Sequence, residues 1–482
     1  MHDAFFFLWI AYKLAVIAAV VHVLMDRRQP VKTMAWAMVI YFVPVIGIVL
    51  YLFFGVNTRR ERLISKRSMD EITRRSMLSF IGNHSDETDN MTLGDIPEQH
   101  RQTVDFFINR GLALPFEEND VDIYTNGEAA FGAVLNDIRN ATEHIHVDMY
   151  IFADDTLGQT VADALCERAR HGVEVRVIYD DVGCWRVKSA FFERMRECGV
   201  EVCPFLPVRF PSFTSKVNYR NHRKIIVVDG NVGFIGGMNI ASRYVHGVRG
   251  VPWRDTMVRI TGDAVYSLQR AFLIDWYFVD RTQISARKYY PPVRRTAGTK
   301  CMIQIVTSDA LTPYSEIMQG YMRVILNARR YVYIQTPYFL PTEPVACALK
   351  TAALSGVDVC VMVPERSDTP FISSASMPFL REMAAAGVNV ALYTAGFLHS
   401  KLLVADDNVA SCGSTNIDAR SFDNNFESNA FFFDTHVAVQ FRDIFLDDMT
   451  RCRRLADDNS LLNPTLPRRL AESVTRLLAP LL

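Results

Sequence analysis

The 482-residue sequence lacks the residue patterns that mark disulfide frameworks and metal sites. Its nine cysteines include no Cys-x-x-Cys pair, and no group of His and Cys residues has the spacing of zinc ligands. An odd number of cysteines favours buried or free thiols in a reducing compartment over paired cystines. We therefore expect chemistry that depends on neither a bound metal nor a cofactor.

A net excess of charge of either sign is also absent. The 52 Lys and Arg residues balance 53 Asp and Glu residues, which gives a formal net charge of −1. Without a general basic excess, a nucleic-acid partner is not expected. Hydrophobic residues make up 49% of the chain, which is high for a purely soluble protein and favours contact with a membrane bilayer.

Two long apolar segments lie near the N-terminus. Phe5–Met25 and Met34–Phe54 each contain 21 mostly apolar residues, and a helix of that length, about 31 Å, can cross a bilayer. A cleaved signal peptide would need a basic stretch before Phe5 and a small-residue cleavage site after the segment, and both are missing. A buried soluble hairpin would be shorter. The sequence therefore predicts a two-span transmembrane anchor over residues 1–60.

Basic residues beside these segments predict the orientation of the anchor. The connector between the segments carries three basic residues, whereas the stretch after the second carries seven, which are Arg59, Arg60, Arg62, Lys66, Arg67, Arg74 and Arg75. Basic flanks remain in the cytoplasm. We therefore expect the N-terminus and the rest of the chain on the cytoplasmic side of the membrane.

One pattern of five residue types occurs twice in the chain. In both copies Lys follows His by two residues, Asp by seven, Gly by fourteen and Asn by seventeen. This agreement indicates an internal duplication in which each copy supplies half of an active site. The first copy is His222, Lys224, Asp229, Gly236 and Asn239, and the second is His399, Lys401, Asp406, Gly413 and Asn416.

Each motif leads into a hydrophobic run, Ile225–Val228 or Leu402–Ala405, that predicts a strand. Residues two apart share a strand face, so His and Lys of each copy point the same way. Two His, two Lys and two Asn around one cavity suit a phosphodiester substrate. The Lys and Asn side chains can bind its non-bridging oxygens, while one imidazole attacks phosphorus and the other protonates the leaving alcohol.

The paired motifs resemble those of the phospholipase D superfamily, and their surroundings are similar to bacterial cardiolipin synthases. The similar segments are Gly236–Asn239, Trp253–Asp255, Gly413–Ser421 and Asn425–Glu427, and the likeness extends through the N-terminal segments. It implies an α/β fold with two phospholipase D-like α/β/α halves in a pseudo-twofold arrangement. Met257 departs from the family pattern, because many relatives carry His at this position. This difference is expected to affect local packing or contacts with the lipid headgroup.

The resemblance also implies roles for single residues. Asp255 and Glu427 would each hydrogen-bond an active-site imidazole and fix its tautomer. Asp229 and Asp406 belong to the catalytic motifs and end their strands, where they brace backbone or Lys. The substrate-binding residues would be Asn239, Asn416, Gly236, Gly413 and Ser414, with the glycines allowing close approach of the backbone.

The implied activity is phosphatidyl transfer between two phosphatidylglycerol molecules, giving cardiolipin and glycerol at the bacterial cytoplasmic membrane. His222 is the nucleophile in the family's usual order, and the reverse order is the alternative. Three other enzyme classes share the motifs and are the alternatives: a membrane phospholipase D, a nuclease and a phosphatidylserine synthase-like transferase. A non-enzymatic scaffold would not need to keep both His–Lys pairs. The oligomeric state stays open.

The duplication extends beyond the motifs. Ile145–Phe152 matches Val332–Phe339, and two later Gly-Val-x-Val segments in each copy match one another. Strands that alternate with helices predict α/β units with largely parallel sheets. We expect the division 61–104 polar linker, 105–295 first half, 296–455 second half and 456–482 C-terminal amphipathic tail.

Two further segments can be interpreted in two ways each. Phe205–Tyr219 mixes aromatic and basic residues, which suits insertion into a bilayer and equally suits packing against the protein. In the tail, Leu470, Val474 and Leu477 have helical spacing beside three arginines. That pattern suits interfacial membrane binding or docking on the protein's own surface.

Overall fold

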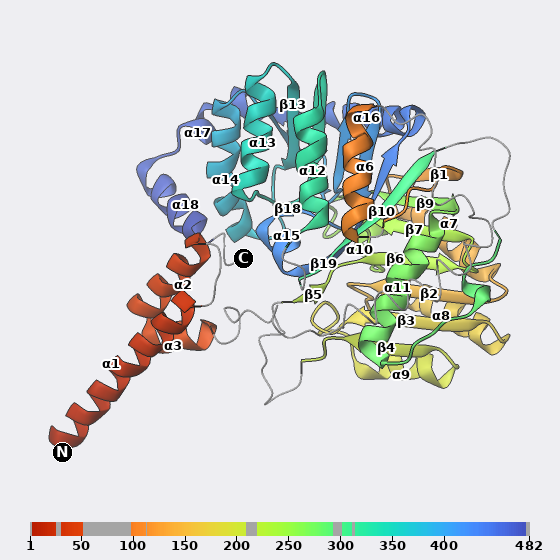
Figure 1. Cartoon of the computed structure of the whole chain (residues 1–482), viewed down its shortest axis with the longest axis horizontal. Coiled ribbons are helices and arrows are strands. Elements are labelled where there is room, and N and C mark those ends of the chain that lie inside the picture. Colours follow the sequence, from red (N-terminus) through yellow and green to blue (C-terminus); the bar gives the residue numbers. More distant parts are fainter. Residues whose placement is uncertain are drawn as a thin grey trace.

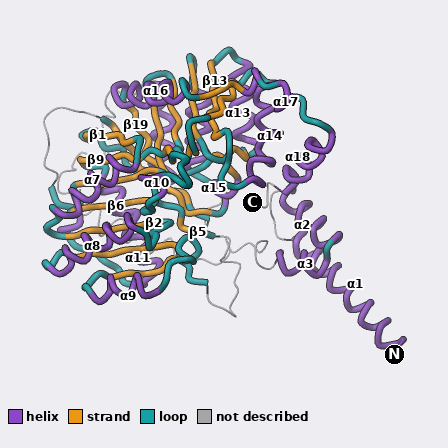
Figure 2. Tube along the Cα trace, turned by 180° about the vertical axis from the view of Figure 1, so that it is seen from behind, coloured by secondary structure: helices purple, strands orange, loops and turns teal. Residues whose placement is uncertain are grey.

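The computed structural model of the chain describes residues 2–25, 30–51, 98–111, 113–208, 219–292, 301–310 and 314–478. Two β-sheets with packed helices form the body of the molecule, and three N-terminal helices project from it (Figure 1). Figure 2 shows the strands of both sheets inside this body. The expected α/β architecture with two halves is confirmed.

The first sheet lies within residues 119–262, and its strand order is β1-β9-β7-β6-β2-β3-β4. Its strands are β1 Asn119–Tyr124, β2 His144–Met149, β3 Glu174–Asp180, β4 Glu201–Phe205, β6 Lys224–Val228, β7 Val232–Gly236 and β9 Met257–Gly262. Its helices are α7 Gly127–Arg139, α8 Thr156–Arg170, α9 Ser189–Glu197 and α11 Val265–Asp280.

The second sheet repeats this order as β10-β19-β17-β16-β11-β13-β14 and adds β20 at its edge. The strands are β10 Met302–Ser308, β11 Tyr331–Gln335, β13 Asp358–Pro364, β14 Asn389–Tyr393, β16 Leu402–Ala405, β17 Val409–Gly413, β19 Asn425–Phe433 and β20 Cys452–Arg454. The helices are α12 Glu316–Asn327, α13 Glu343–Leu354, α14 Pro370–Ala385 and α16 Thr435–Met449. The motif strands β6 and β16 occupy equivalent places, as the duplication predicts.

Short elements complete the described fold. Four of them, β5 Arg220–Asn221, β8 Trp253–Arg254, β15 Phe397–Leu398 and β18 Ile417–Asp418, lie beside the motifs. The others are β12 Phe339–Leu340, α10 Arg243–His246, α15 Ala419–Asp423, α17 Asn459–Leu462, α18 Leu466–Leu478 and the 3₁₀ turns Arg287–Tyr289 and Leu455–Asp457.

Both sheets are mixed, which corrects the expectation of largely parallel sheets. Along the two strand orders, only β2-β3-β4 and β11-β13-β14 pair in parallel. Strand β6 runs antiparallel to both β2 and β7. The reason lies in the turn between β6 and β7, because the few residues after Val228 cannot form the long crossover that parallel neighbours require.

Side-chain caps fix where several of the helices begin. The side chains of Asn126, Asp155, Ser315 and Asp434 each accept a hydrogen bond from the backbone N–H three residues later. This satisfies a donor that the first helical turn leaves without an intrahelical partner. Helix starts in both halves therefore follow from local sequence.

A shared core joins the halves. Apolar side chains of α11 and α16 belong to one buried cluster together with strands of both sheets. In this cluster Phe426 of β19 contacts Phe205 of β4, with 5.0 Å between ring centroids. Helices α7–α9 cover the first sheet within a second cluster, and α12–α14 cover the second sheet within a third. The two halves therefore form a single packed body.

Helix α6 (Glu98–Gly111) overlaps the end of the stretch expected as a polar linker, and residues 61–97 lie outside the described residues. Its side chains Val104 and Phe107 are fully buried against the second half. Gln304 of β10 donates to the carbonyl of Val104 at 3.2 Å. A helix that precedes the first half in sequence thus packs on the second.

The N-terminal arm contains α1 His2–Met25, α2 Pro30–Phe42 and α3 Pro44–Leu50. Helix α1 contains the first predicted apolar segment. The second segment is not one continuous helix, because Pro44 lacks a backbone N–H and begins a new helix after Val43. Residues 52–54 of that segment lie outside the described residues. Across the described helices, none combines the length and apolar character needed to cross a membrane.

Close strand contact gives a test of the packing around the second motif. A Cβ on Gly413 would lie 2.3 Å from the carbonyl oxygen of Ser428 on β19, so Gly413→Ala must displace one strand. We expect the midpoint of thermal unfolding to fall by roughly 2–10 °C. The control is Gly132→Ala in α7, where a Cβ meets nothing within 4 Å and the midpoint should hold or rise. Equal midpoints for both variants would contradict this packing.

Candidate active site

The two motif histidines face one cavity between the halves. The cavity has a volume of about 270 Å³, and both imidazoles line it. The cavity is also lined by Tyr150, Asn239, Tyr244, Tyr338, Asp368, Ile372 and Asn416. The sequence-predicted halves thus meet as one site.

Two short parallel ladders cross between the halves and set the position of each His. Strand β5, directly before His222, pairs with Asn425–Phe426 at the start of β19. Strand β15, directly before His399, pairs with β8. The backbone N–H of His222 donates to the carbonyl of Phe426 at 2.9 Å, and that of His399 donates to Arg254 at 2.7 Å. Each ladder therefore places a motif His beside the residue that directly precedes Glu427 or Asp255 in the opposite half.

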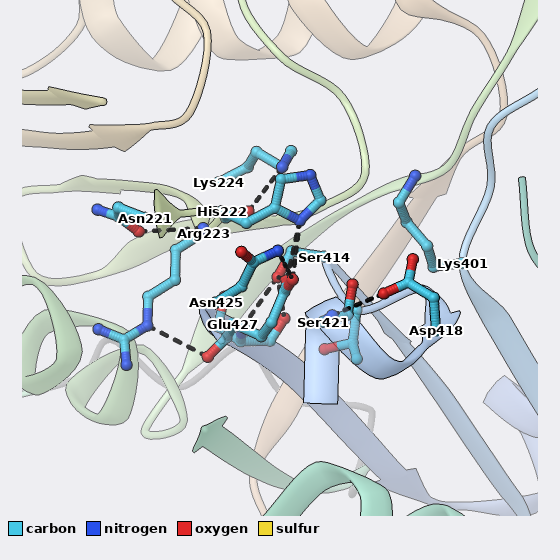
Figure 3. Close-up of polar contacts among 12 residues, drawn as sticks. Asn221, His222, Arg223, Lys224, Lys401, Ser414, Asp418, Ser421, Asn425 and Glu427 are labelled. Atoms are coloured by element: carbon cyan, nitrogen blue, oxygen red, sulfur yellow. Dashed lines mark hydrogen bonds and ion pairs between the residues drawn. The ribbon is translucent and has the colours of Figure 1, made fainter. Parts of the chain in front are cut away.

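As a result, each imidazole binds the carboxylate of the other half. His222 Nδ1 lies 3.0 Å from both carboxylate oxygens of Glu427 (Figure 3). His399 Nδ1 lies 2.7 Å from Oδ2 of Asp255. Because a carboxylate only accepts, each Nδ1 carries the proton and each Nε2 keeps its lone pair for the cavity. Both acids were predicted from the sequence, but the sequence did not predict that each would bind the imidazole of the opposite half.

Glu427 is itself held in place by polar neighbours. Ser414 Oγ donates to Glu427 Oε2, and Asn425 Nδ2 donates to Oε1 at 3.1 Å (Figure 3). Ser414 was expected to bind substrate, but its hydroxyl contacts this carboxylate, and it also accepts from the backbone N–H of Ser428 at 3.0 Å. The Ser414 hydroxyl therefore supports the carboxylate that holds the imidazole of His222.

Two arginines fasten the exchanged segments. Arg223, between His222 and Lys224, donates from Nε to the carbonyl of Glu427 at 3.2 Å and pairs with Asp275 of α11. Arg254 of β8 donates to the carbonyl of Asp255 at 2.8 Å and reaches Asp448 of α16. Sequence reasoning missed both roles, although Arg223 lies between the motif His and Lys and Arg254 lies within the segment Trp253–Asp255.

The two motif lysines are buried beside the imidazoles. Lys224 and Lys401 are each 1% exposed. Lys224 Nζ donates to the carbonyl of His222 at 2.6 Å, and Lys401 Nζ lies 2.9 Å from His399 Nδ1. Burial lowers the pKa of Lys224 to about 7 and that of Lys401 to about 8. Each lysine also lowers the other half's imidazole pKa, so the four groups share one electrostatic environment.

Burial likewise lowers the imidazole pKa values. The pKa of His222 falls to about 4, although Glu427 opposes the shift, and that of His399 falls to about 3 because Lys401 adds to the effect of burial. The pKa of Glu427 is lowered by its contact with His222, against burial. With no anion in the cavity, both imidazoles are therefore neutral at pH 7.

The motif asparagines both line the cavity. Asn239 accepts from the backbone N–H of Ile151 at 3.1 Å and donates to the hydroxyl of Tyr244 at 2.6 Å. Asn416 Oδ1 is buried and has no hydrogen-bond partner among the described residues. Because buried polar atoms are nearly always paired, this amide is suited to a ligand.

The motif aspartates lie away from the cavity. Asp229 accepts from the backbone N–H groups of Thr142, Glu143 and His144, and Asp406 does the same for residues 329–331. Both adopt a positive φ, 51° and 55°, in the hairpin turns after their strands, where Asp is tolerated. Their carboxylates thus join the motif hairpins to β2 and β11.

The motif glycines make a close approach, but to protein. A Cβ at Gly236 would lie 2.4 Å from the carbonyl oxygen of Thr256, and Gly413 is equally tight against β19. Neither glycine lines the cavity. Met257, the departure from the family, is buried in the core of the first half.

Two tyrosines beside the imidazoles were also missed. The ring centroid of Tyr150 lies 4.9 Å from that of His222, and Tyr338 lies 6.4 Å from His399. In the repeat, Tyr150 lies two residues before Phe152 and Tyr338 lies one residue before Phe339, so the two tyrosines are offset by one place and the repeat did not mark them. Most of the segment Phe205–Tyr219, with Phe210 and Phe213, lies outside the described residues. Phe205 at its start is buried in the core.

Two repeated halves that bring His–Lys motifs to one cavity define a phospholipase D-type active site. The family described as cardiolipin synthase, phospholipase D-like domain, matches residues 134–276 and 321–449, and the phospholipase D–nuclease N-terminal family matches residues 14–55. The chain belongs to the cardiolipin synthase family.

Known proteins agree with this assignment. The chain is 37% identical to cardiolipin synthase of Oceanobacillus iheyensis over 98% of each chain. It is 36% identical to the major cardiolipin synthase of Bacillus subtilis over 97% of each. The crystal structure of Haemophilus influenzae phosphatidylserine synthase matches with a TM-score of 0.61 at 15% identity, covering 79% of this chain and 100% of that one. The last likeness concerns the fold alone.

The exchanged pairing predicts which imidazole each acid controls. Glu427→Gln removes the carboxylate from His222 Nδ1, so Nε2 of His222 becomes less nucleophilic while His399 keeps Asp255. We expect acylation of His222 by diethyl pyrocarbonate, followed by peptide mass spectrometry, to slow about fivefold or more, with His399 unchanged. Asp255→Asn should produce the reverse pattern. Slower acylation of the His in the same half as the mutated acid would contradict the exchange.

Proposed function

We propose that the protein transfers a phosphatidyl group from one phosphatidylglycerol to a second, forming cardiolipin and releasing glycerol. The observation that carries the proposal is the pair of imidazoles in one cavity, each held by a carboxylate of the opposite half. This arrangement supplies a nucleophile and a proton donor on the two sides of one phosphorus atom. Membership of the cardiolipin synthase family supports the choice of substrates.

In the first step Nε2 of His222 attacks the phosphorus of the donor lipid. A nitrogen–phosphorus bond forms while the bond from phosphorus to the glycerol oxygen breaks. His399, protonated at Nε2, gives its proton to that oxygen, and glycerol leaves. Glu427 stabilises the positive charge that develops on His222. Lys224, Lys401 and the motif asparagines stabilise the non-bridging oxygens.

In the second step the acceptor lipid enters where glycerol left. His399, now neutral, removes the proton from its primary hydroxyl, and that oxygen attacks phosphorus. The nitrogen–phosphorus bond breaks, which restores neutral His222 and yields cardiolipin. Transfer requires that the lipid hydroxyl, and not water, occupies this place in the cavity.

The charges of the cavity explain how the proton reaches His399. Burial, with a further contribution from Lys401, lowers the pKa of His399 to about 3. A phosphodiester carries a negative charge, which offsets the lysines and raises the pKa of every nearby base. Substrate binding therefore promotes the protonated state that the first step needs.

We further propose that residues 1–60 attach the enzyme to the bacterial cytoplasmic membrane, with the active site at the cytoplasmic face. Support comes from the basic residues after the arm and from its exposed apolar side chains, such as Phe7, Trp9 and Phe42. Holding the site at the bilayer raises the effective concentration of lipid substrates.

Hydrolysis by a phospholipase D and transfer to serine are the competing outcomes. Purified enzyme given labelled phosphatidylglycerol, with serine and water also present, separates them by product. Cardiolipin as the main product supports the proposal. Phosphatidic acid or phosphatidylserine as the main product would overturn it.

An activated lipid assigns the two imidazoles. Phosphatidyl-p-nitrophenol has a leaving group that needs no proton, so its release depends on the nucleophile alone. We expect His399→Ala to release one equivalent of nitrophenolate and then stall, because the adduct on His222 has no base to activate an acceptor. His222→Ala should release none, and both variants should lose about 1000-fold or more of cardiolipin formation. Full turnover by either variant would exclude a two-half site.

The lysine pKa values predict an alkaline limb in the pH profile of kcat/KM. Lys224 has a pKa lowered to about 7 and Lys401 to about 8, so each is charged below that pH and loses its charge as pH rises through it. Activity should therefore fall above about pH 7. Lys224→Arg keeps the charge and should move the fall to the Lys401 range, whereas exposed Lys188→Arg should not. A profile that stays flat to pH 10 would contradict buried, shifted lysines.

A further inference from the structure

The C-terminal helix α18 is attached to the protein by its polar side. Glu472 is 2% exposed and forms ion pairs with Arg381 of α14 and with Arg468 at 2.9 Å. Arg476 pairs with Glu382 of α14 at 2.9 Å. The contact between α14 and α18 thus includes two ion pairs and the Arg476 guanidinium over the ring of Phe379, where packed helices usually place apolar side chains.

The apolar side of α18 faces outward. Leu466, Leu470, Val474 and Leu477, named below as the α18 stripe, are 79%, 65%, 52% and 69% exposed. Their spacing places them on one helix face. The tail does dock on the protein's own surface, but the four described residues of the stripe do not face α14. Arg469 lies beside the stripe, is exposed and has no acidic partner among the described residues.

Helix α14 connects this stripe to the active site. Ile372 in its first turns and the preceding Asp368 both line the catalytic cavity, and Ser374 contacts Thr475 of α18 at 3.3 Å. The N-terminal arm, with its exposed apolar side chains, lies on the same side of the body as α18 (Figure 1). The cavity, the stripe and the arm therefore share one region of the molecule.

We propose that the α18 stripe lies in the headgroup region of the lipid bilayer and aligns the catalytic cavity with the membrane surface. The inference rests on the proposed function in that the cavity receives lipids. Four apolar side chains with flanking arginine are typical of an interfacial helix, whose cations meet anionic headgroups. A second copy of the chain is a poorer occupant, because a stable dimer buries roughly 800 Å² per partner and this stripe is one short helix face.

Substrate presentation tests the role of the stripe. The full chain carrying Leu470→Asp with Val474→Asp should lose about tenfold or more of its activity on phosphatidylglycerol vesicles. Activity on a short-chain phosphatidylglycerol kept monomeric in water should stay within twofold, because the catalytic groups are untouched. The matched control is Leu326→Asp with Leu354→Asp, two exposed leucines on α12 and α13, which should behave as wild type in both assays.

A fluorophore tests bilayer contact without turnover. A nitrobenzoxadiazole label on Leu470→Cys, in a Cys347→Ser background, should be quenched by spin-labelled lipid in vesicles of phosphatidylcholine and phosphatidylglycerol. The same label on Leu354→Cys should be quenched by aqueous iodide instead. This readout stands even if the product proves not to be cardiolipin.

Three outcomes would overturn the proposal. Quenching of the Leu470→Cys label by iodide alone would place the stripe in water. Equal loss of activity on vesicles and on monomeric lipid would mean that α18 shapes the active site. A change from dimer to monomer in the Leu470→Asp, Val474→Asp variant, measured by light scattering in detergent, would assign the stripe to a second copy.

Discussion

The exchange of backbone ladders between the halves is the constraint on which the active site depends. Each ladder is only two residues long, yet it fixes the register of a motif His against the acid of the opposite half. The imidazoles therefore acquire their orientation only when the halves are packed together. Neither half alone contains a complete His–carboxylate pair, so catalysis is a property of the assembled body.

Burial at this junction shapes the chemistry. Two lysines, two imidazoles and two carboxylates are taken from water, which is unfavourable for every charged form. Glu427 and Asp255 offset part of that cost for the lysines, and the remainder appears as lowered pKa values. A bound phosphodiester supplies the negative charge that the lysines lack. The cavity is thus electrostatically complementary to the substrate, and most of all to the transition state, where charge on the oxygens increases.

Local and repeated features could be predicted from the sequence. The predicted strands Ile225–Val228 and Leu402–Ala405 fall within β6 and β16 because runs of apolar residues report burial directly. The duplication predicted the equivalent strand orders. The prediction of largely parallel strands was wrong, because the periodicity of the motif does not report the length of the turn after Val228. The helix break at Pro44 was not predicted, because the apolar composition of Met34–Phe54 was given more weight than the backbone N–H that proline lacks.

Long-range features could not be predicted. His222 and Glu427 are 205 residues apart, and nothing near either residue reports the ladder that joins them. The same applies to Ser414, whose motif position suggested substrate but whose hydroxyl holds Glu427. Helix α18 shows a related limit, because periodicity identifies an apolar face but not the direction in which it points.

The most direct measurement of the central claim is the burst rate with phosphatidyl-p-nitrophenol in the acid variants, with the burst located on His222. The exchanged pairing predicts that Glu427→Gln slows the burst, whereas Asp255→Asn leaves the burst intact and slows only the later turnover. A burst slowed by Asp255→Asn and unaffected by Glu427→Gln would mean that each imidazole is oriented within its own half, and the account given by the ladders would be wrong.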